Sequence, residues 1–155
     1  ATLHRPYNTD SPKRLRRVIA ALASLPLPVV LPAHPRLVHL AAINGIKLDG
    51  GSIRVTAPLS YHNLIYLASN ARAIVTDSGG LQKEAFLLGV PCTTIRTETE
   101  WIETLNDEWN VLTFDDIEGL PGVCLRPIPA VPRGAPFGTG HAAEKVAQAL
   151  AEWPG

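Results

Sequence analysis

Short apolar runs alternate along this chain with longer segments whose apolar residues recur every three or four positions. The run PVVLPA at 28–33 is apolar almost throughout, which is typical of a parallel strand buried on both faces. The segment 11–25 instead places Leu15, Ile19 and Leu22 on one face, with Pro12 in the first turn, and so predicts an amphipathic helix. The full pattern predicts strands at 1–4, 28–33, 52–57, 72–77, 91–96 and 110–114, and helices at 11–25, 35–44, 61–70, 80–88, 99–105 and 140–153.

This alternation of strands and helices predicts an α/β, Rossmann-like domain in three layers, with a parallel sheet between two layers of helices. The alternation weakens at 119–138, a stretch rich in Pro and Gly that we interpret as an ordered connector. We therefore expect one domain over 1–155. Ligands of such sheets bind beyond the carboxyl ends of the strands, where this chain carries LHRPYN, AHPR, APLSY, DSGG and RTETEW.

Composition and charge exclude several classes of function. Hydrophobic residues make up 46% and charged residues 18%, as in globular proteins, and the formal net charge of +0 argues against a nucleic-acid module. No apolar run approaches the roughly 20 residues that span a bilayer, so we expect no membrane partner. The two cysteines form no disulfide framework, so we expect a cytoplasmic location. Cys92 and Cys124 show no metal-site or disulfide spacing; we expect Cys92 to be a small core residue and predict no metal site. The sequence contains no Met and opens within its pattern, so we expect a piece of a longer protein.

The segment TDSGGLQKEA predicts a strand, a tight turn and a helix start within ten residues. The paired glycines Gly79 and Gly80 would present backbone N–H groups at the positive end of a helix dipole, which suits an anion. A tight turn without a ligand explains the glycines equally well. Glu84 lies one helical turn further on, where a carboxylate can accept hydrogen bonds from two neighbouring hydroxyls, as on a ribose. An exposed surface glutamate is the alternative.

Histidine and arginine residues follow several of the predicted strands. His4 with Arg5, His34 with Arg36, and Arg96 all occupy such positions. A single histidine at a strand end is more often structural than functional. Two sets of imidazole and guanidinium at neighbouring strand ends, however, suit a diphosphate or a developing negative charge.

Several segments resemble, in the same order, those of the non-hydrolysing UDP-N-acetylglucosamine 2-epimerases. They are TLHRPYNTD, PAHPR, APLSY, TDSGGLQKEA, LGVP, IRTETEW and PFGTGHAAEKV, and they span nearly the whole chain. The resemblance implies the C-terminal half of a GT-B fold, with an N-terminal lobe that this chain lacks and a homodimer in the intact enzyme. It also implies a role in cell-surface polysaccharide biosynthesis.

The resemblance further implies roles for individual residues. The diphosphate of a UDP-sugar would lie on Ser78, Gly79 and Gly80 with His34 nearby, Glu84 would hold the ribose, and Leu64 would lie against the uracil. His4 and Arg5 would be catalytic residues facing the sugar. From its place at a strand end, Arg96 is also expected to bind UDP. The implied reaction interconverts UDP-N-acetylglucosamine and UDP-N-acetylmannosamine, or a modified UDP-HexNAc. UDP is eliminated to give a glycal and then adds back, with no cofactor. We expect the isolated chain to be inactive.

Two positions depart from the pattern of that family. Tyr7 stands where a glutamate is common, and Trp101 replaces an arginine, as in a subgroup that includes epimerases of diacetamido uronic acids. Two other functions remain open. One is the nucleotide-sugar-binding lobe of a GT-B glycosyltransferase, and the other is a UDP-sugar sensor without catalytic activity.

Overall fold

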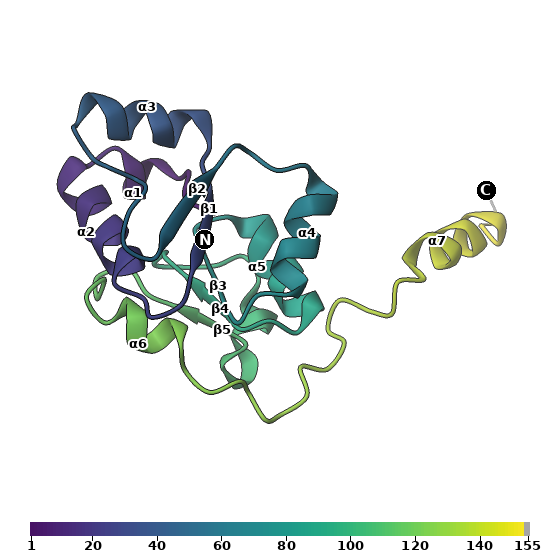
Figure 1. Cartoon of the computed structure of the whole chain (residues 1–155). Coiled ribbons are helices and arrows are strands. Elements are labelled where there is room, and N and C mark those ends of the chain that lie inside the picture. The colour runs from purple at the N-terminus through teal and green to yellow at the C-terminus, as the bar shows by residue number, and fades with distance from the viewer. Residues whose placement is uncertain (154–155) are drawn as a thin grey trace.

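The computed structural model describes residues 1–153 and confirms the α/β architecture (Figure 1). Its strands are β1 (Val29–Pro32), β2 (Ile53–Thr56), β3 (Ile74–Thr76), β4 (Cys92–Thr94) and β5 (Asn110–Leu112). Its helices are α1 (Pro6–Thr9), α2 (Pro12–Ala23), α3 (Pro35–Ile43), α4 (Tyr61–Ser69), α5 (Gly79–Leu88), the 3-10 helix η1 (Ile102–Glu108), α6 (Leu120–Cys124) and α7 (Ala142–Ala151).

All the strand pairs are parallel, and residues 1–3 join two groups of strands into one layer. β1 pairs with β2, while β3, β4 and β5 pair in that order. The Ala1 nitrogen donates to the Val30 carbonyl at 2.8 Å, and the Thr2 N–H donates to the Val75 carbonyl at 2.9 Å. The spatial order is therefore β2, β1, residues 1–3, β3, β4, β5, and the carboxyl ends of all these segments lie along one edge.

The predicted strand at 1–4 is wrong as a regular strand. Only one bridge forms, between Thr2 and Thr76. The backbone N–H groups of His4 and Arg5 donate to the side chain of Asp77 rather than to a neighbouring strand. Pro6 then begins α1, a single helical turn too short to produce a periodic pattern in the sequence.

Two apolar cores lie on opposite faces of the strands, which accounts for the three layers. Figure 1 shows α2, α3 and α6 on one side and α4 and α5 on the other. The first core is built from α2, α3, α6 and the strands, and the second from α4, α5 and β4. Cys92 and Cys124 are buried free thiols, as expected for Cys92. Within residues 1–153, no helix has both the length and the apolar composition to cross a membrane.

Side-chain caps begin the helices that lead into the site. The hydroxyls of Ser11, Ser60 and Ser78 accept backbone N–H groups at the starts of α2, α4 and α5. Gly89 ends α5 with φ 70°, a left-handed conformation that glycine adopts without steric cost.

Two of the sequence predictions are corrected on the C-terminal side. The segment predicted as a helix at 99–105 is instead the 3-10 helix η1, interrupted where Asp107 has φ 52°. The connector at 119–138 contains α6, because Leu120 and Cys124 are buried and Pro121 suits a first helical turn.

The last helix, α7, is confirmed but stands apart from the rest of the chain (Figure 1). None of its residues is buried. The chain leading to it is attached through Phe137, whose ring meets Phe86 and Trp101 edge-on at 5.6 and 5.7 Å. α7 therefore contributes no packing to either core.

A chain shortened to end after Thr139 should have the same free energy of unfolding as residues 1–155, because residues 140–153 are exposed. Urea unfolding of both chains measures the difference. Phe86→Ala, at a side chain only 1% exposed, is the positive control and should cost about 3–5 kcal/mol. A loss above about 1 kcal/mol in the shortened chain would show that α7 packs on the body.

Candidate functional site

A pocket of about 260 Å³ lies at the carboxyl ends of the strands. Four of the residues singled out in the sequence line it: His4, His34, Leu64 and Ser78. They come from the end of the first segment, the end of β1, helix α4 and the turn after β3. The sheet thus brings together residues that are far apart in the sequence, with aliphatic side chains such as Leu59 and Leu81 completing the lining.

The two glycines of the turn have different surroundings. A Cβ on Gly79 would clash with Oε1 of Glu100, whereas a Cβ on Gly80 would meet nothing nearer than Ser78 Oγ at 4.0 Å. Gly80 is exposed, and within residues 1–153 neither glycine N–H has a hydrogen-bond acceptor. The start of α5 therefore has two N–H groups without an acceptor; that of Gly80 lies next to open space, which suits an anion, whereas Gly79 is buried against the Glu100 carboxylate.

Asp77 is the residue of the site that the sequence reasoning missed. Its side chain is 0% exposed. Oδ1 accepts from His4 Nδ1 at 3.0 Å and from the His4 backbone N–H at 3.1 Å, while Oδ2 accepts from the Arg5 N–H at 3.0 Å and Asn8 Nδ2 at 3.1 Å. An Asp directly after an apolar strand and before a glycine turn was the available signal. Through these hydrogen bonds, Asp77 holds the segment that carries His4 against the turn that carries Ser78.

The surroundings of Asp77 explain its charge. Burial alone would raise the pKa of Asp77, but hydrogen bonds from the His4 and Asn8 side chains and the Arg5 backbone lower it below the usual 3.8. Asn8 also donates to the Ile95 carbonyl and accepts from Arg14 Nε at 2.8 Å. The carboxylate is therefore held ionised by a network that reaches the next strand end.

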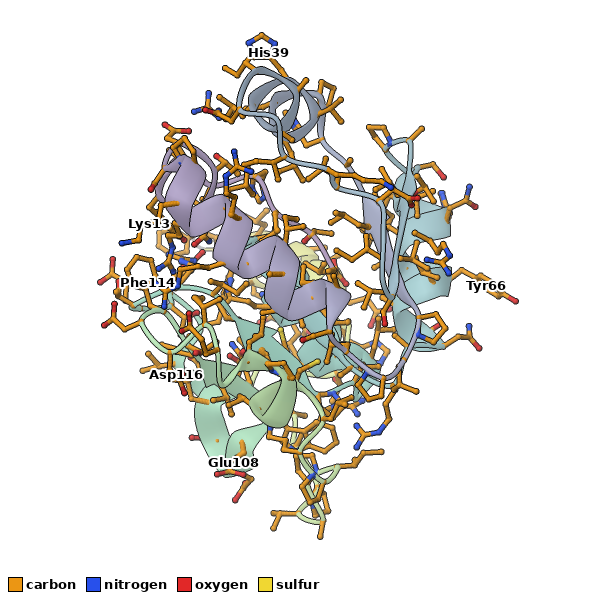
Figure 2. All side chains as sticks on the ribbon, turned by 60° about the vertical axis from the view of Figure 1, so that its left-hand side comes forward. Lys13, His39, Tyr66, Glu108, Phe114 and Asp116 are labelled. Carbon is orange, nitrogen blue, oxygen red and sulfur yellow. The ribbon has the colours of Figure 1, made fainter. Side chains whose placement is uncertain are left out.

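Tyr7, one of the two departures from the family pattern, packs against an aromatic neighbour. Its ring meets the Phe114 ring edge-on at 5.7 Å, and the guanidinium of Arg14 lies 3.7 Å from the centre of the Phe114 ring. Figure 2 shows Phe114 beside α2, close to the outer surface. Tyr7 lies outside the lining of the pocket.

The arginines lie near the glycine turn rather than in the lining of the pocket. Arg96 pairs with Glu100 at 2.7 Å, and the Arg5 Nε atom is buried without a hydrogen-bond partner in the described part of the chain. The backbone N–H of Glu100 itself, with Arg96 and Arg5, lowers the pKa of the Glu100 carboxyl. Glu100 therefore places a carboxylate between the two arginines and Gly79.

Glu84 already accepts a hydrogen bond from a hydroxyl group of the protein. Tyr61, at the first position of α4, donates its phenolic O–H to Glu84 Oε1 at 3.0 Å, and Tyr61 was not expected in this role. The hydrogen bond to Glu84 raises the pKa of Tyr61. The half-buried Glu84 carboxylate is therefore oriented by Tyr61, and its second oxygen can accept a further hydrogen bond.

Trp101, the other departure, belongs to an aromatic cluster beside the site. Lys83 Nζ lies 4.3 Å from the centre of the Trp101 ring and 4.5 Å from that of Phe137. The Trp101 backbone N–H donates to Thr99 Oγ1, which in turn donates to the buried Gln82 side chain at 2.6 Å. These contacts fix the segment that carries Glu100.

A larger cavity, of about 410 Å³, extends from the amino ends of β1 and β3 toward the smaller pocket and shares Thr2, Pro32, Leu64 and Leu81 with its lining. Its lining is mostly aliphatic, including Leu25, Leu67, Ala71 and Leu125. None of the candidate histidines lines it, so we assign the site to the smaller pocket. No group of three potential metal ligands occurs among residues 1–153.

The depressed pKa of Asp77 makes the stability of the chain dependent on pH. A carboxyl whose pKa is lower in the folded state stabilises the fold above its ordinary value, 3.8, and this contribution is lost as the pH falls below that value. We expect unfolding measured between pH 7 and pH 2 to show a steeper loss of stability below about pH 4 in the unmodified chain than in Asp77→Asn. Equal slopes would show that Asp77 is not preferentially ionised in the folded state.

Known proteins are similar to this chain in sequence and in fold. A sequence model of the family described as UDP-N-acetylglucosamine 2-epimerase matches residues 1–151. A UDP-N-acetylglucosamine 2-epimerase homolog of Methanococcus maripaludis is 37% identical over an alignment of 155 positions that covers 97% of this chain and 43% of the relative. A UDP-2,3-diacetamido-2,3-dideoxy-D-glucuronate 2-epimerase of Pseudomonas aeruginosa is 44% identical over an alignment of 115 positions that covers 72% of this chain and 32% of the relative.

The fold agrees with a solved structure of the same kind of protein. The crystal structure of Methanocaldococcus jannaschii UDP-GlcNAc 2-epimerase in complex with UDP-GlcNAc and UDP superposes with a TM-score of 0.82 at 30% identity. That match covers 98% of this chain and 44% of the other. The chain spans less than half the length of these relatives. By sequence and by fold, the chain belongs to the UDP-N-acetylglucosamine 2-epimerase family.

Proposed function

We propose that this chain is the UDP-binding lobe of a UDP-sugar 2-epimerase. The observation that carries the proposal is the pocket of about 260 Å³ that His4, His34, Leu64 and Ser78 line at the start of α5. The pocket combines two histidines with aliphatic side chains, and Ser78 in its lining directly precedes the two glycine N–H groups that have no acceptor among residues 1–153. This combination suits a nucleoside diphosphate better than a neutral metabolite.

Each part of UDP has a chemically suitable neighbour. The diphosphate would lie on the N–H groups of Gly79 and Gly80, beside Ser78. The uracil would lie against Leu64, and the ribose hydroxyls would donate to the Glu84 oxygen that Tyr61 leaves open. His34 would contact the diphosphate as well.

The arginines have a separate part in the proposal. Arg96 and Arg5 flank Glu100, where they could stabilise the charge of departing UDP. Arg5 is adjacent in sequence to His4, which faces the pocket, so this pair would lie on the sugar side.

The reaction of the intact protein would be inversion at C2 of the sugar. A base removes the C2 proton, the electron pair forms the C1–C2 double bond, and UDP leaves from C1 with the bonding electrons. UDP then adds back at C1, and a proton returns to C2 from the opposite face. Groups must therefore flank the sugar on both sides, whereas the edge of one sheet forms a single wall. The second wall would come from a further lobe of the intact protein. From the family resemblance, we also propose that the intact protein forms a homodimer.

The family match favours an epimerase over a GT-B glycosyltransferase, because the matching model spans residues 1–151 and describes epimerases. The sugar is proposed to be a UDP-HexNAc. The Pseudomonas relative is named for a diacetamido glucuronate, so the modified sugar nucleotide belongs in the same assay. A sensor without activity is separated from an enzyme by turnover in the intact protein.

Glu84→Ala should weaken UDP binding to this chain by about 1.5–3 kcal/mol, the range for hydrogen bonds to a charged group. Titration calorimetry at fixed salt gives the two affinities. Glu108→Ala is the matched control, since Glu108 is an exposed carboxylate at the amino side of β5 (Figure 2). If Glu84→Ala binds UDP as well as the control does, Glu84 is not the ribose partner.

Gly80→Val should abolish measurable UDP binding while leaving the fold intact. A Cβ at Gly80 meets no atom nearer than 4.0 Å, so the added side chain would occupy only the space into which the phosphate approaches. Calorimetry measures the binding of UDP, and circular dichroism shows whether the variant is folded. Gly122→Val, at an equally open position in α6, is the control and should bind UDP normally. Undiminished binding by Gly80→Val would place the phosphate elsewhere.

The isolated chain should not catalyse epimerisation, even where it binds UDP, because one wall of the site cannot remove and return a proton on opposite faces. An NMR time course on UDP-N-acetylglucosamine in deuterium oxide follows the manno epimer and deuterium at C2. The intact Methanocaldococcus jannaschii enzyme is the positive control. Deuterium incorporation in proportion to the concentration of the isolated chain would overturn the need for a second wall.

A further inference from the structure

We infer that the two histidines of the pocket hold opposite tautomers when neutral. His4 carries its proton on Nδ1 and offers a lone pair on Nε2, whereas His34 carries its proton on Nε2 and donates from it. The tautomers follow from the protein's own hydrogen bonds. What each nitrogen meets in a ligand rests on the proposed function.

The tautomer of His4 is determined by Asp77. Nδ1 lies 3.0 Å from Asp77 Oδ1, and an ionised carboxylate can only accept hydrogen bonds. The same carboxylate accepts from the backbone N–H groups of His4 and Arg5 and from Asn8 Nδ2, and these hydrogen bonds favour its ionised form. Nδ1 must therefore be the donor, so a neutral His4 has an unprotonated Nε2.

The tautomer of His34 is determined by the start of α3. His34 is the N-cap of that helix, and its Nδ1 accepts from the backbone N–H of Arg36 at 3.1 Å. A backbone N–H can only donate, so Nδ1 is unprotonated and the proton of a neutral ring lies on Nε2. Pro35 has no N–H, which leaves Arg36 as the first donor that the cap can satisfy. A proton on Nδ1 would break the cap.

The two imidazoles therefore give the pocket one hydrogen-bond acceptor, His4 Nε2, and one donor, His34 Nε2–H. Both histidines are among the residues that line it, and neither Nε2 atom has a hydrogen-bond partner within residues 1–153. The Nε2–H of His34 matches a phosphate oxygen, which can only accept. The Nε2 lone pair of His4 matches a hydroxyl or amide N–H of the sugar. Asp77 is then a positioning residue, because it determines which nitrogen of His4 meets the ligand.

The test is a two-bond ¹H–¹⁵N NMR spectrum of this chain with ¹⁵N-labelled histidine, recorded without ligand at alkaline pH, where imidazoles are neutral. In such spectra a protonated ring nitrogen resonates far upfield of an unprotonated one. His4→Gln and His34→Gln assign the two spin systems. We expect the upfield nitrogen to be Nδ1 in His4 and Nε2 in His34. The same tautomer in both rings would overturn the inference.

A variant and a control isolate the cause. In Asp77→Asn the side-chain amide can donate to His4 Nδ1, so the His4 pattern should reverse or become mixed while that of His34 stays unchanged. His39 is the internal reference, because it is exposed on the outer side of α3 (Figure 2) and has no side-chain hydrogen bond in the described part of the chain. An unchanged His4 pattern in a folded Asp77→Asn would contradict the assignment to Asp77. If that variant does not fold, the spectrum of the unmodified chain still decides.

Adding UDP separates this inference from the function on which it rests. If UDP binds, the Nε2–H signal of His34 should shift while the ring remains in the same tautomer. If UDP does not bind but the ligand-free tautomers are as stated, the proposed function fails and the tautomer assignment stands. If UDP binds and the His34 Nε2 signal is unmoved, the donor role of His34 is overturned.

Discussion

The buried carboxylate of Asp77 is the interaction on which the site depends. It ends β3, precedes the glycine turn and accepts hydrogen bonds from the backbone and side chain of His4, from the Arg5 backbone and from Asn8. Leaving one charge uncompensated in the interior is costly, so each of these donors is needed to stabilise the carboxylate. The same hydrogen bonds hold the first residues of the chain against the start of α5. One electrostatic requirement therefore sets both the fold at the sheet edge and the shape of the pocket.

The region around the glycine turn shows how the chain arranges its charges before any ligand binds. Glu100 lies against Gly79 and pairs with Arg96, while the Arg5 Nε atom has no hydrogen-bond partner among the described residues. Gly79 is thus required by the protein's own packing, whereas a Cβ at position 80 would meet no atom nearer than 4.0 Å and would occupy only the space beside the turn. Two adjacent glycines in one motif therefore have different surroundings, which the motif itself does not reveal.

The order and type of the main elements could be predicted from the sequence because buried strands and amphipathic helices have distinct apolar periods. The elements that were missed, α1 and α6, are single turns set by prolines and by burial of one or two side chains, such as Leu120. The strand expected at 1–4 failed because hydrogen bonds to a distant carboxylate replaced those of a ladder. Such long-range pairing leaves no periodic signal.

The residues that line the candidate site could be predicted from the sequence, whereas the residues that orient them could not. Strand-end logic selected His4, His34 and Ser78, and the family resemblance added Leu64; the structure places all four around one pocket. The partners that orient them, Asp77 for His4 and Tyr61 for Glu84, lie 73 and 23 positions away in the sequence and depend on which segments the sheet makes neighbours. Residue types at strand ends indicate which chemistry is present, whereas the orientation of that chemistry depends on contacts between segments.

The central claim is that UDP binds at the carboxyl edge of the sheet, in the pocket beside the glycine turn. A ¹H–¹⁵N correlation spectrum of the uniformly labelled chain, titrated with UDP, tests this most directly. The account predicts that the largest amide shifts occur at His4, His34, Gly79 and Gly80. Shifts concentrated instead around Leu25, Leu67 and Leu125, which line the larger cavity, would contradict it.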